Sequence, residues 1–331
     1  MSIPATMRAL QQTSLDGPRG LRLVTGAPVP SPGPGEVLIR VAAAGVNFVD
    51  ISQSRGTFAG GPQPPYLAGI EGAGEVVAAG QGVSVEPGAH VVGVGIRGGA
   101  FAEYMVLPAA GVVPVPAGWA DEQALGMVVS WPTALAALGP LGRIRAGETV
   151  LIHAAAGGTG QAAVKAAKHY GATVIAAAAR EKHAAVRALG AQHVIDSRGA
   201  DLVAEVRRLT DGVGADLVLE SAGGVTLAAS LAAAKRVTGR VVVYGLAGGE
   251  AAVTNWDLVY RHPVQLIGLN IGALIQFAPQ IFGAVMDEMF TLLAAGVLGP
   301  GQPTSYALTE GPTALAQLEA RATVGKLALV P

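Results

Sequence analysis

The segment Thr149–Gly171, TVLIHAAAGGTGQAAVKAAKHYG, holds the residues whose types and spacing point most directly to chemistry. An apolar run typical of a strand, Thr149–Ala154, leads into a glycine-rich loop, and a segment with helical periodicity follows. The loop consists of Ala156, Gly157, Gly158, Thr159 and Gly160. Because a helix that begins at glycines exposes backbone N–H groups and its positive dipole end, this unit predicts a binding site for the pyrophosphate of a dinucleotide.

The loop departs from the usual G-x-G-x-x-G pattern at one position. The first glycine would fall at Ala155, so the chain reads A-x-G-G-x-G. Alanine is compatible with the turn if its φ stays negative, and the departure therefore weakens the pattern without excluding the site.

Composition limits the classes of function. The 331 residues are enough for two domains, each with its own core. The net charge is −1, the pI is about 6.6, and no Lys/Arg cluster occurs, which argues against nucleic acid as a main partner. The chain has no cysteine, so it can form neither disulfides nor Cys-ligated zinc sites. A reducing cytoplasm is the simplest location.

A mean hydropathy of +0.46 raises the question of a membrane. Two stretches, 123–142 and 264–286, carry no charge, but prolines and polar residues interrupt both. We therefore expect both to be buried elements of a large soluble core. The N-terminal MSIPATMRALQQ lacks the apolar region of a signal peptide.

The pattern of elements divides the chain. Residues 1–120 contain short strand-like runs between turn signals, at 35–45, 72–80, 88–95 and 101–108, which predicts a β-rich, barrel-like unit. From about residue 127, apolar strands alternate with helical segments, which predicts an α/β unit with a doubly wound parallel sheet. After Gly272 come two further helical runs and a last strand, Leu327–Val330. We expect this tail to return to the first domain.

Several segments in order resemble one family over nearly the full length. They are MRAL (7–10), AGVNFVDISQSRGTF (44–58), GIEGAGEV (69–76), GGAFAEYMVLP (98–108), SWPTALAAL (130–138), AAAGGTGQAAVKAAKHYGA (154–172), ALGAQHVID (188–196) and RATVGKLALVP (321–331). The chain resembles the zinc-independent medium-chain dehydrogenase/reductases of the quinone oxidoreductase type. The resemblance implies a GroES-like catalytic domain (1–126), a Rossmann NADPH-binding domain (127–267), a return to the catalytic domain (268–331), an active-site cleft between the domains, and a homodimer.

The resemblance also bears on metal. Zinc-dependent relatives carry a cysteine where this chain has Val46 or Asn47, and Gly-His-Glu where it has Gly69-Ile70-Glu71. Thiolate and imidazole are the ligands that hold zinc in such sites. With Ile70 in place of the histidine and no cysteine, we expect no metal.

The second strand of the α/β unit bears on the choice of cofactor. An NAD site places Asp or Glu at the end of this strand, but here Ala176–Ala179 lead into Arg180, Glu181 and Lys182. The two cations could bind a 2′-phosphate, which favours NADPH. The alternative is that 180–182 form only the solvated first turn of a helix. By resemblance, Ser197 replaces a tyrosine beside the adenosine phosphate, and Arg321 matches a further phosphate-side arginine.

Candidates for the acceptor side follow from the resemblance. Asn47, Ser130 and Thr133 would form the polar wall, with Asn47 donating a hydrogen bond to the acceptor carbonyl; Asn47 and Thr133 would also contact the cofactor. A turn-capping role for Asn47 is the alternative. Ser52 replaces a tyrosine that is often found in the active site, and Asp50 is expected to make structural hydrogen bonds.

Other residues have weaker assignments. Gly245 and Leu269-Asn270-Ile271 follow later strands, where open α/β sheets bind ligands, and should line the nicotinamide. His153 is expected to be a packed, hydrogen-bonded residue. Neither G-x-S-x-G nor H-E-x-x-H occurs.

Together these patterns predict an NADPH-dependent reductase of quinones or related α,β-unsaturated carbonyls, acting on a small molecule and not on nucleic acid or at a membrane. Two alternatives stay open. One is an enoyl-thioester or alkenal reductase of the same superfamily. The other is a catalytically silent NADPH-binding protein, because binding motifs survive when catalysis is lost.

Overall fold

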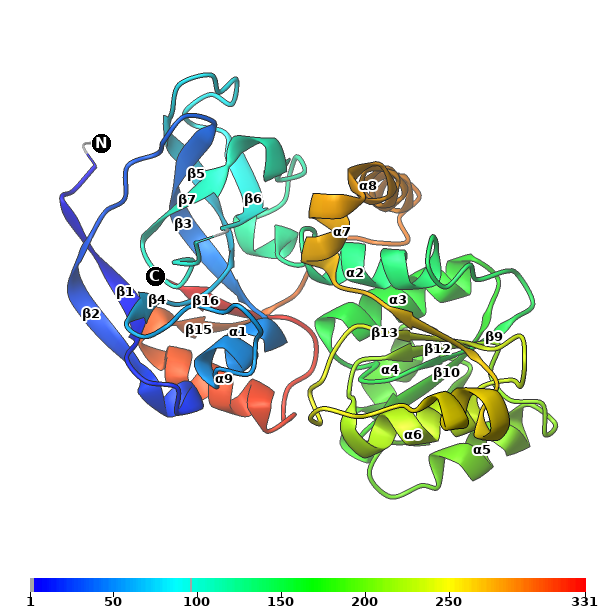
Figure 1. Cartoon of the computed structure of the whole chain (residues 1–331). Coiled ribbons are helices and arrows are strands. Elements are labelled where there is room, and N and C mark those ends of the chain that lie inside the picture. Colours follow the sequence, from blue (N-terminus) through cyan, green and yellow to red (C-terminus); the bar gives the residue numbers. More distant parts are fainter. Residues whose placement is uncertain (1–2, 96) are drawn as a thin grey trace. The chain divides into compact units, whose positions relative to one another are not determined.

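The computed structural model describes residues 3–95 and 97–331. The chain forms two compact units (Figure 1). Unit 1 comprises Met1–Val129 and Pro300–Pro331, and unit 2 comprises Ser130–Gly299.

Unit 1 is built on strands that pair antiparallel, except for the parallel pair β15–β16. One sheet has the order β2-β1-β4, and the other has the order β15-β16-β3-β5-β6-β8, with β7 also paired to β3. The strands are β1 (Thr6–Gln12), β2 (Leu21–Pro28), β3 (Glu36–Val46), β4 (Tyr66–Leu67), β5 (Glu71–Ala79), β6 (His90–Val94), β7 (Tyr104–Pro108), β8 (Val113–Pro114), β15 (Thr304–Ala307) and β16 (Leu327–Val330). The four strand runs predicted within 35–108 are confirmed as β3, β5, β6 and β7.

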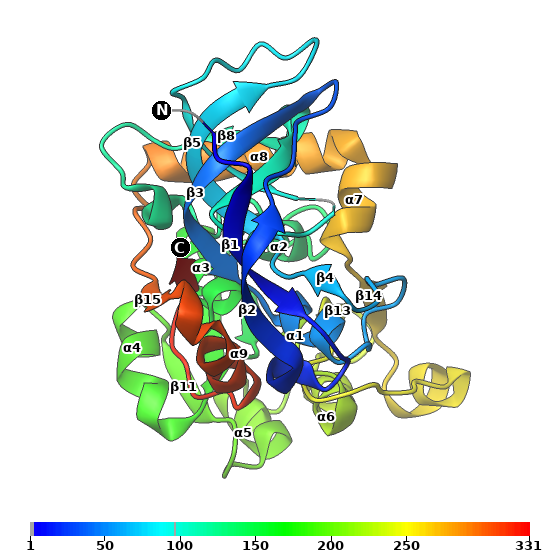
Figure 2. The same cartoon turned by 90° about the vertical axis from the view of Figure 1, so that its left-hand side faces the viewer.

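Two short helices of unit 1 come from distant parts of the sequence. Helix α1 (Phe48–Ser54) and helix α9 (Gly311–Glu319) lie close together in Figures 1 and 2. Arg55, at the end of α1, donates two hydrogen bonds to the Glu319 carboxylate, at 2.8 and 2.9 Å. The C-terminal strand β16 pairs with β3, so the end of the chain lies beside the segment that leads into α1.

Unit 2 is a parallel sheet of order β11-β10-β9-β12-β13-β14. Figure 1 shows α2 and α3 on one face of this sheet and α5 and α6 on the other. Its strands are β9 (Thr149–Ile152), β10 (Thr173–Ala178), β11 (His193–Asp196), β12 (Leu217–Glu220), β13 (Arg240–Val243) and β14 (Gln265–Gly268). Its helices are α2 (Ser130–Leu138), α3 (Gly158–His169), α4 (His183–Ala188), α5 (Leu202–Leu209), α6 (Gly224–Ala233), α7 (Ile271–Phe277) and α8 (Pro279–Ala294). The predicted doubly wound α/β unit is confirmed.

Shorter helical turns complete both units. They are 3-10 turns at Gly17–Gly20, Ala109–Gly111, Asp121–Ala124, Arg180–Lys182 and Leu308–Glu310, and a π-helical turn at Asp257–Arg261.

The structure corrects the expectation that everything after Gly272 returns to the first domain. Strand β14 and helices α7 and α8 belong to unit 2, which runs to Gly299. The reason lies in the apolar face of α8, where Val285, Met289 and Leu292 are buried. Only β15, α9 and β16 return to unit 1. The assignment of catalytic and cofactor roles to the two units stays a prediction.

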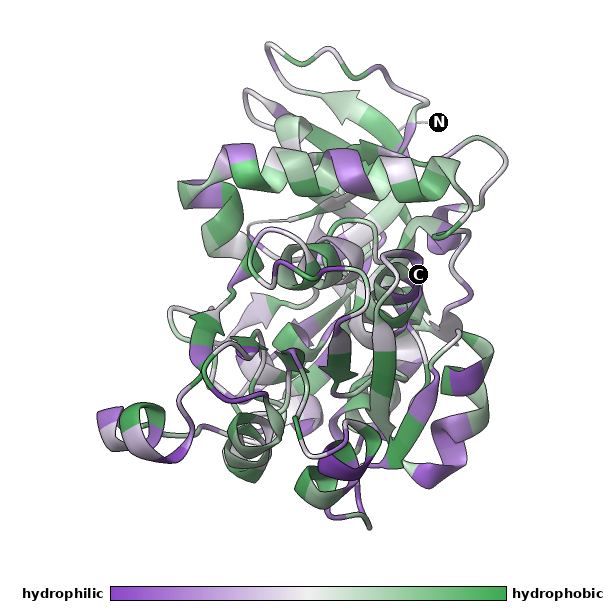
Figure 3. Cartoon of the chain, turned by 90° about the vertical axis from the view of Figure 1, so that its right-hand side faces the viewer, coloured by the Kyte–Doolittle hydropathy of each residue, from purple (hydrophilic) through white to green (hydrophobic). Residues whose placement is uncertain are grey.

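The two uncharged stretches behave differently. Residues 130–138 form α2, which is buried throughout, as expected. Residues 264–286 divide among β14, α7 and α8 and are largely exposed, so the expectation of burial is wrong for them. The coloured ribbon of α8 accordingly alternates between polar and apolar residues (Figure 3). No described helix combines the length and apolar composition needed to cross a bilayer.

Candidate functional site

Asn47 lies in a turn between β3 and α1. Its backbone N–H donates to Asp50 Oδ2 at 2.7 Å, so the carboxylate of Asp50 caps the start of α1. The side chain of Asn47 is 8% exposed and points elsewhere. Its Nδ2 donates to the carbonyl of Gly45 at 3.1 Å and to Glu71 Oε2 at 2.8 Å.

Glu71 is the fully buried acceptor of this cluster. Besides Asn47, the backbone N–H of Gly126 donates to its Oε1 at 2.6 Å, and Lys326 Nζ lies 2.5 Å from its Oε2. The Lys326 ammonium also donates to Asn47 Oδ1 at 2.7 Å. We call Asn47, Glu71 and Lys326 the ammonium cluster.

Sheet register explains why these three residues meet. Gly45 of β3 pairs with Glu71 of β5, and Leu327 of β16 pairs with Val46 on the other side of β3. Residues at the same level of three adjacent strands thus converge, although Asn47 and Lys326 are 279 positions apart in sequence. The hydrogen bonds of Asn47 agree only in part with the predicted turn-capping alternative, because Asp50 makes the cap.

Asp50 borders the ammonium cluster in an unusual state for a carboxyl group. Burial raises its pKa from 3.8 to about 7, although the N–H of Asn47 and the charge of Lys326 oppose the shift. Its Oδ1 has no hydrogen-bond partner among the described residues. Burial, together with the nearby Asp50 charge, also raises the pKa of Tyr66 to about 12.

The remaining predicted acceptor-side residues are also buried. Ser52 lies on α1, and its hydroxyl donates a long hydrogen bond, 3.4 Å, to the carbonyl of Phe48. Ser130 and Thr133 lie on α2 of unit 2, at 6% and 9% exposure.

The glycine-rich loop of unit 2 has the predicted strand–loop–helix form. Helix α3 begins at Gly158, and Gly157 at its N-cap has no side chain to satisfy the first-turn N–H groups. Gly160 packs so closely on the carbonyl of Ala154 that no Cβ would fit. The positive φ, 47°, falls at Ala154 and not at Ala155. The loop therefore fits an anion such as a pyrophosphate.

The predicted phosphate-binding cations form a short 3-10 turn after β10. Arg180 Nε lies 3.4 Å from Asp196 Oδ2, and Glu181 pairs with Arg198 at 3.0 Å. Burial lowers the pKa of Lys182. An acid is thus present after all, on the neighbouring strand, because Ala178 of β10 pairs in register with Asp196 of β11. The HVID segment that ends in Asp196 could have indicated it.

The other predicted cofactor residues lie as follows. Ser197 follows β11 and is exposed, with its N–H bonded to the carbonyl of Ala178 at 3.0 Å. Gly245 has no room for a side chain, because a Cβ would lie 2.5 Å from the carbonyl oxygen of Ser221. The backbone N–H of Leu269 donates to the carbonyl of Val243. The side-chain oxygen of Asn270 caps α7 by accepting the N–H of Ala273. Arg321 lies in unit 1, at a positive φ of 57°.

A second buried polar cluster follows strands β9 and β12. The hydroxyl of Ser230 donates to Glu220 Oε2 at 2.5 Å and lies 2.9 Å from His153 Nε2. Glu220 Oε1 accepts the N–H groups of Ala222 and Gly223, at 2.6 and 2.9 Å. We call His153, Glu220 and Ser230 the hydroxyl cluster. All three are at most 4% exposed.

The hydroxyl cluster is not a hydrolytic triad. The serine donates to the glutamate and not to the histidine, and Ser230 is completely buried on α6. Burial lowers the pKa of His153, although the charge of Glu220 opposes this shift, so the ring is neutral. His153 is thus the packed, hydrogen-bonded residue that the sequence predicted.

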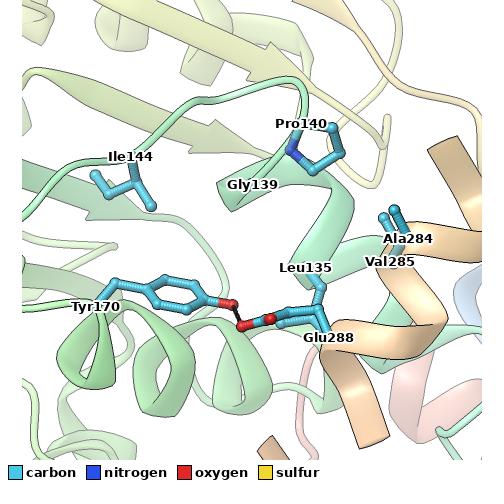
Figure 4. Close-up of a pocket in the computed structure, with 8 residues that line it drawn as sticks. All are labelled: Leu135, Gly139, Pro140, Ile144, Tyr170, Ala284, Val285 and Glu288. Carbon is cyan, nitrogen blue, oxygen red and sulfur yellow. Dashed lines mark hydrogen bonds between the residues drawn. The ribbon is translucent and has the colours of Figure 1, made fainter. Parts of the chain in front are cut away.

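Unit 2 also contains a cavity of about 310 Å³. Its wall is mostly apolar, with a Tyr170–Glu288 hydrogen bond of 2.8 Å at one side (Figure 4). None of the predicted site residues lines it. The lining residues are Leu135, Gly139, Pro140, Ile144, Tyr170, Ala284, Val285 and Glu288.

Comparison with known proteins gives this geometry a family. The alcohol dehydrogenase GroES-like domain matches residues 33–117, and a domain described as zinc-binding dehydrogenase matches residues 158–291. A synaptic vesicle membrane protein VAT-1 homolog of Rattus norvegicus is 31% identical, covering 98% of this chain and 84% of the relative. The quinone oxidoreductase of Pseudomonas syringae is 33% identical, with a TM-score of 0.91, covering 98% of this chain and 100% of the other. This chain is a medium-chain dehydrogenase/reductase of the quinone oxidoreductase type.

Other relatives of this dehydrogenase/reductase differ in description and length. The Escherichia coli quinone oxidoreductase complexed with NADPH is 29% identical, with a TM-score of 0.90 over 98% of this chain and 100% of that one. A mycocerosic acid synthase-like polyketide synthase of Mycobacterium tuberculosis is 35% identical over 90% of this chain. The match spans only 14% of that relative's length.

The description of one matching domain as a zinc-binding dehydrogenase raises the question of whether a zinc ion fits this chain. The described residues contain no group of three His, Cys, Asp or Glu side chains that could hold a metal ion. Glu71, which by resemblance matches the glutamate of the Gly-His-Glu segment, already accepts hydrogen bonds from Asn47, Gly126 and Lys326. A metal ion bound to Glu71 Oε2 would meet the ammonium of Lys326, and like charges repel. The residues present do not fit a catalytic zinc.

Proposed function

We propose that this protein is an NADPH-dependent reductase that transfers hydride to quinones or related α,β-unsaturated carbonyls, without zinc. The observation that carries the proposal is the β9–loop–α3 unit, whose first helical turn offers backbone N–H groups to a pyrophosphate. The NADPH complex of the Escherichia coli relative supports the choice of cofactor.

Particular residues would hold the cofactor. The N–H groups of residues 158–160 would bind the pyrophosphate. Arg180 and Lys182 would bind the 2′-phosphate by charge-assisted hydrogen bonds, with Arg180 shared between this phosphate and Asp196. Contacts of Thr133, Ser197 and Arg321 with the cofactor, and of Gly245 and Leu269-Asn270-Ile271 with the nicotinamide, stay predictions.

Bound NADPH would supply the hydride. The chain's own contribution would be to orient the acceptor and to donate a hydrogen bond to its oxygen. Asn47 would do this by exchanging its longest bond, 3.1 Å to the carbonyl of Gly45, for one to the substrate. Its other amide hydrogen would stay on Glu71. Roles for Ser52, Ser130 and Thr133 stay predictions.

The cofactor half of the proposal is tested by fluorescence titration of NADPH and NADH. A charge-assisted bond contributes roughly 1.5–3 kcal/mol, so Lys182→Ala should weaken NADPH binding by about 10-fold or more and leave NADH unchanged. Lys168→Ala, an exposed lysine at the other end of α3, is the matched control. Equal affinities for the two cofactors in the wild type would contradict the proposal.

The position of the pyrophosphate is tested separately. Gly158→Asp places a carboxylate at the start of α3, where it would repel the pyrophosphate, and should abolish cofactor binding while the protein stays folded. Circular dichroism monitors the fold. A folded variant that binds NADPH normally would move the phosphate site elsewhere.

A second function, reduction of an enoyl thioester, is favoured by the likeness to the CurK enoyl reductase, which is 28% identical with a TM-score of 0.88 over 98% of this chain and 99% of that one. Single-turnover rates with a 1,4-benzoquinone and with a trans-2-enoyl thioester discriminate between the two. Both acceptors take up one hydride and one proton, but the hydroquinone anion can take its proton on oxygen from water, whereas the enolate must be protonated on carbon, which a positioned donor would assist. Tight NADPH binding without turnover on either acceptor would instead favour the silent binding protein.

We also propose a homodimer. Strand β14 is an edge of its sheet, which leaves backbone groups available for a second copy. Exposed apolar side chains occur on the elements around it, including Leu266 and Phe277, at 36% and 77% exposure. Light scattering coupled to size exclusion measures the mass of the particle; a monomer at micromolar concentration would rule the dimer out.

A further inference from the structure

The ammonium cluster is a closed arrangement around one cation. Lys326 Nζ lies 2.5 Å from Glu71 Oε2 and 2.7 Å from Asn47 Oδ1. The Lys326 side chain is 10% exposed and that of Glu71 is not exposed at all. Ion pairs at this depth require good geometry and additional hydrogen bonds, and Gly126 and Asn47 provide both.

The backbone beside this pair leaves room for the cation. A Cβ on Gly45 would lie 2.5 Å from Glu71 Oε2 and 2.9 Å from Lys326 Cε. Any larger residue at position 45 would therefore displace the ammonium or the carboxylate. The absence of a side chain at Gly45 is thus part of the cluster.

The ammonium also determines which way the Asn47 amide faces. Only the carbonyl oxygen of the amide can accept from an ammonium, and only its NH₂ can donate to a carboxylate. Lys326 on one side and Glu71 on the other therefore direct Oδ1 and Nδ2 without ambiguity.

We propose that Glu71 and Asn47 form a buried cation-binding site that the chain fills with its own ammonium, Lys326. The site recognises a primary ammonium ion by its N–H groups and its charge. Lys326 is then a positioning residue: it neutralises Glu71 and orients Asn47. The cation site itself does not depend on the proposed reductase activity.

Chemical rescue tests the proposal. Lys326→Ala removes the atoms from Cγ to Nζ, which together correspond to n-propylammonium. The variant should lose roughly 10 °C in melting temperature, because a buried carboxylate is left without its partner. Added n-propylammonium should restore most of that loss with saturation, whereas tetramethylammonium at equal ionic strength, which has no N–H groups, should not.

Two further variants guard against failure of the first to fold. Lys326→Ala/Glu71→Gln has no charge to neutralise, so it should be more stable than Lys326→Ala and insensitive to n-propylammonium. Lys326→Arg keeps a cationic donor and should stay close to the wild type. Equal effects of the two ammonium salts, or equal rescue of the double variant, would overturn the proposal.

A functional readout separates positioning from mere stability. In Lys326→Ala/Glu71→Gln, NADPH affinity should stay within about twofold of the wild type, while single-turnover hydride transfer to a quinone slows by about 10-fold, the equivalent of one hydrogen bond. An unchanged rate of hydride transfer would mean that Lys326 stabilises the fold but does not position Asn47 for the reaction. If the wild type transfers no hydride at all, the proposed function fails, but thermal rescue still decides whether the cation site exists.

Discussion

Each unit contains a fully buried carboxylate, Glu71 at the start of β5 in unit 1 and Glu220 at the end of β12 in unit 2, and the two carboxylates are stabilised in different ways. In unit 1, Glu71 is neutralised by a full positive charge, Lys326, and by an amide and a backbone N–H. In unit 2, Glu220 has no cation within hydrogen-bond distance among the described residues and accepts two backbone N–H groups and the hydroxyl of Ser230. His153 lies behind the hydroxyl as a neutral ring.

The difference indicates what each arrangement can tolerate. A carboxylate held by several uncharged donors can lose one of them and keep the others, and each such bond to a charged group contributes about 1.5–3 kcal/mol. A carboxylate held by a buried cation depends on that one partner, and removal leaves an uncompensated charge. Removal of one partner of the carboxylate should therefore destabilise the protein more at the ammonium cluster than at the hydroxyl cluster.

The largest effect should come from Lys326→Met. Loss of the cation from a buried pair destabilises a protein by about 3–5 kcal/mol. Replacing both partners, in Lys326→Met/Glu71→Gln, should recover most of this stability. Urea unfolding of the wild type, the two single variants and the double variant gives the coupling free energy. A coupling near zero would mean that the ammonium cluster is no more sensitive than the hydroxyl cluster.

The next effect concerns Asp50 and depends on pH. Its pKa rises from 3.8 in the unfolded chain to about 7 in the folded protein, so the folded state binds the proton more tightly. Stability from this group is therefore greatest below pH 3.8, falls as pH rises, and is lost above about pH 7. A shift of this size corresponds to about 4 kcal/mol at most.

Asp50→Asn tests this pH dependence. The amide oxygen can still accept the N–H of Asn47, but the residue no longer titrates. The variant should therefore gain stability relative to the wild type as pH rises from 4.5 to 8. Asp287→Asn, an exposed acid on α8, is the control and should show little such gain. A difference between Asp50→Asn and the wild type that is constant with pH would mean that Asp50 titrates normally.

Sequence patterns predicted the elements well and the ammonium cluster poorly, for a physical reason. The periodicity that marks β9, α3 and β10 is local, and the glycine loop lies within that same segment. Lys326 reaches Asn47 only because β16 pairs with β3 across the whole length of the chain. The available signal was a charged residue at the start of an apolar strand, in GIEG and again in VGK.

The same limit explains two other differences. The acid that was missing after β10 is supplied by the neighbouring strand, at Asp196, and sheet order cannot be deduced from the pattern of one strand. Helix α8 has an apolar face that predicts burial, but not against which unit. In the structure, α8 packs against α2 of unit 2, a contact that the local pattern of α8 does not indicate.

The smallest effect should come from the hydroxyl cluster. Ser230→Ala removes one donor from Glu220 and one partner from His153 Nε2, and should cost about 1–3 kcal/mol. Glu220 keeps its two backbone donors, so the loop after β12 should stay in place and NADPH affinity should change little. Ser84→Ala, at an exposed serine of unit 1, is the control. Because burial lowers the pKa of His153 below its ordinary value of 6.5, the ring is uncharged above pH 7 and the stability difference should be constant between pH 7 and 8. A loss of stability as large as that of Lys326→Met would show that the two clusters are equally sensitive to the loss of one partner. A loss that varies over this pH range would show that His153 carries a charge.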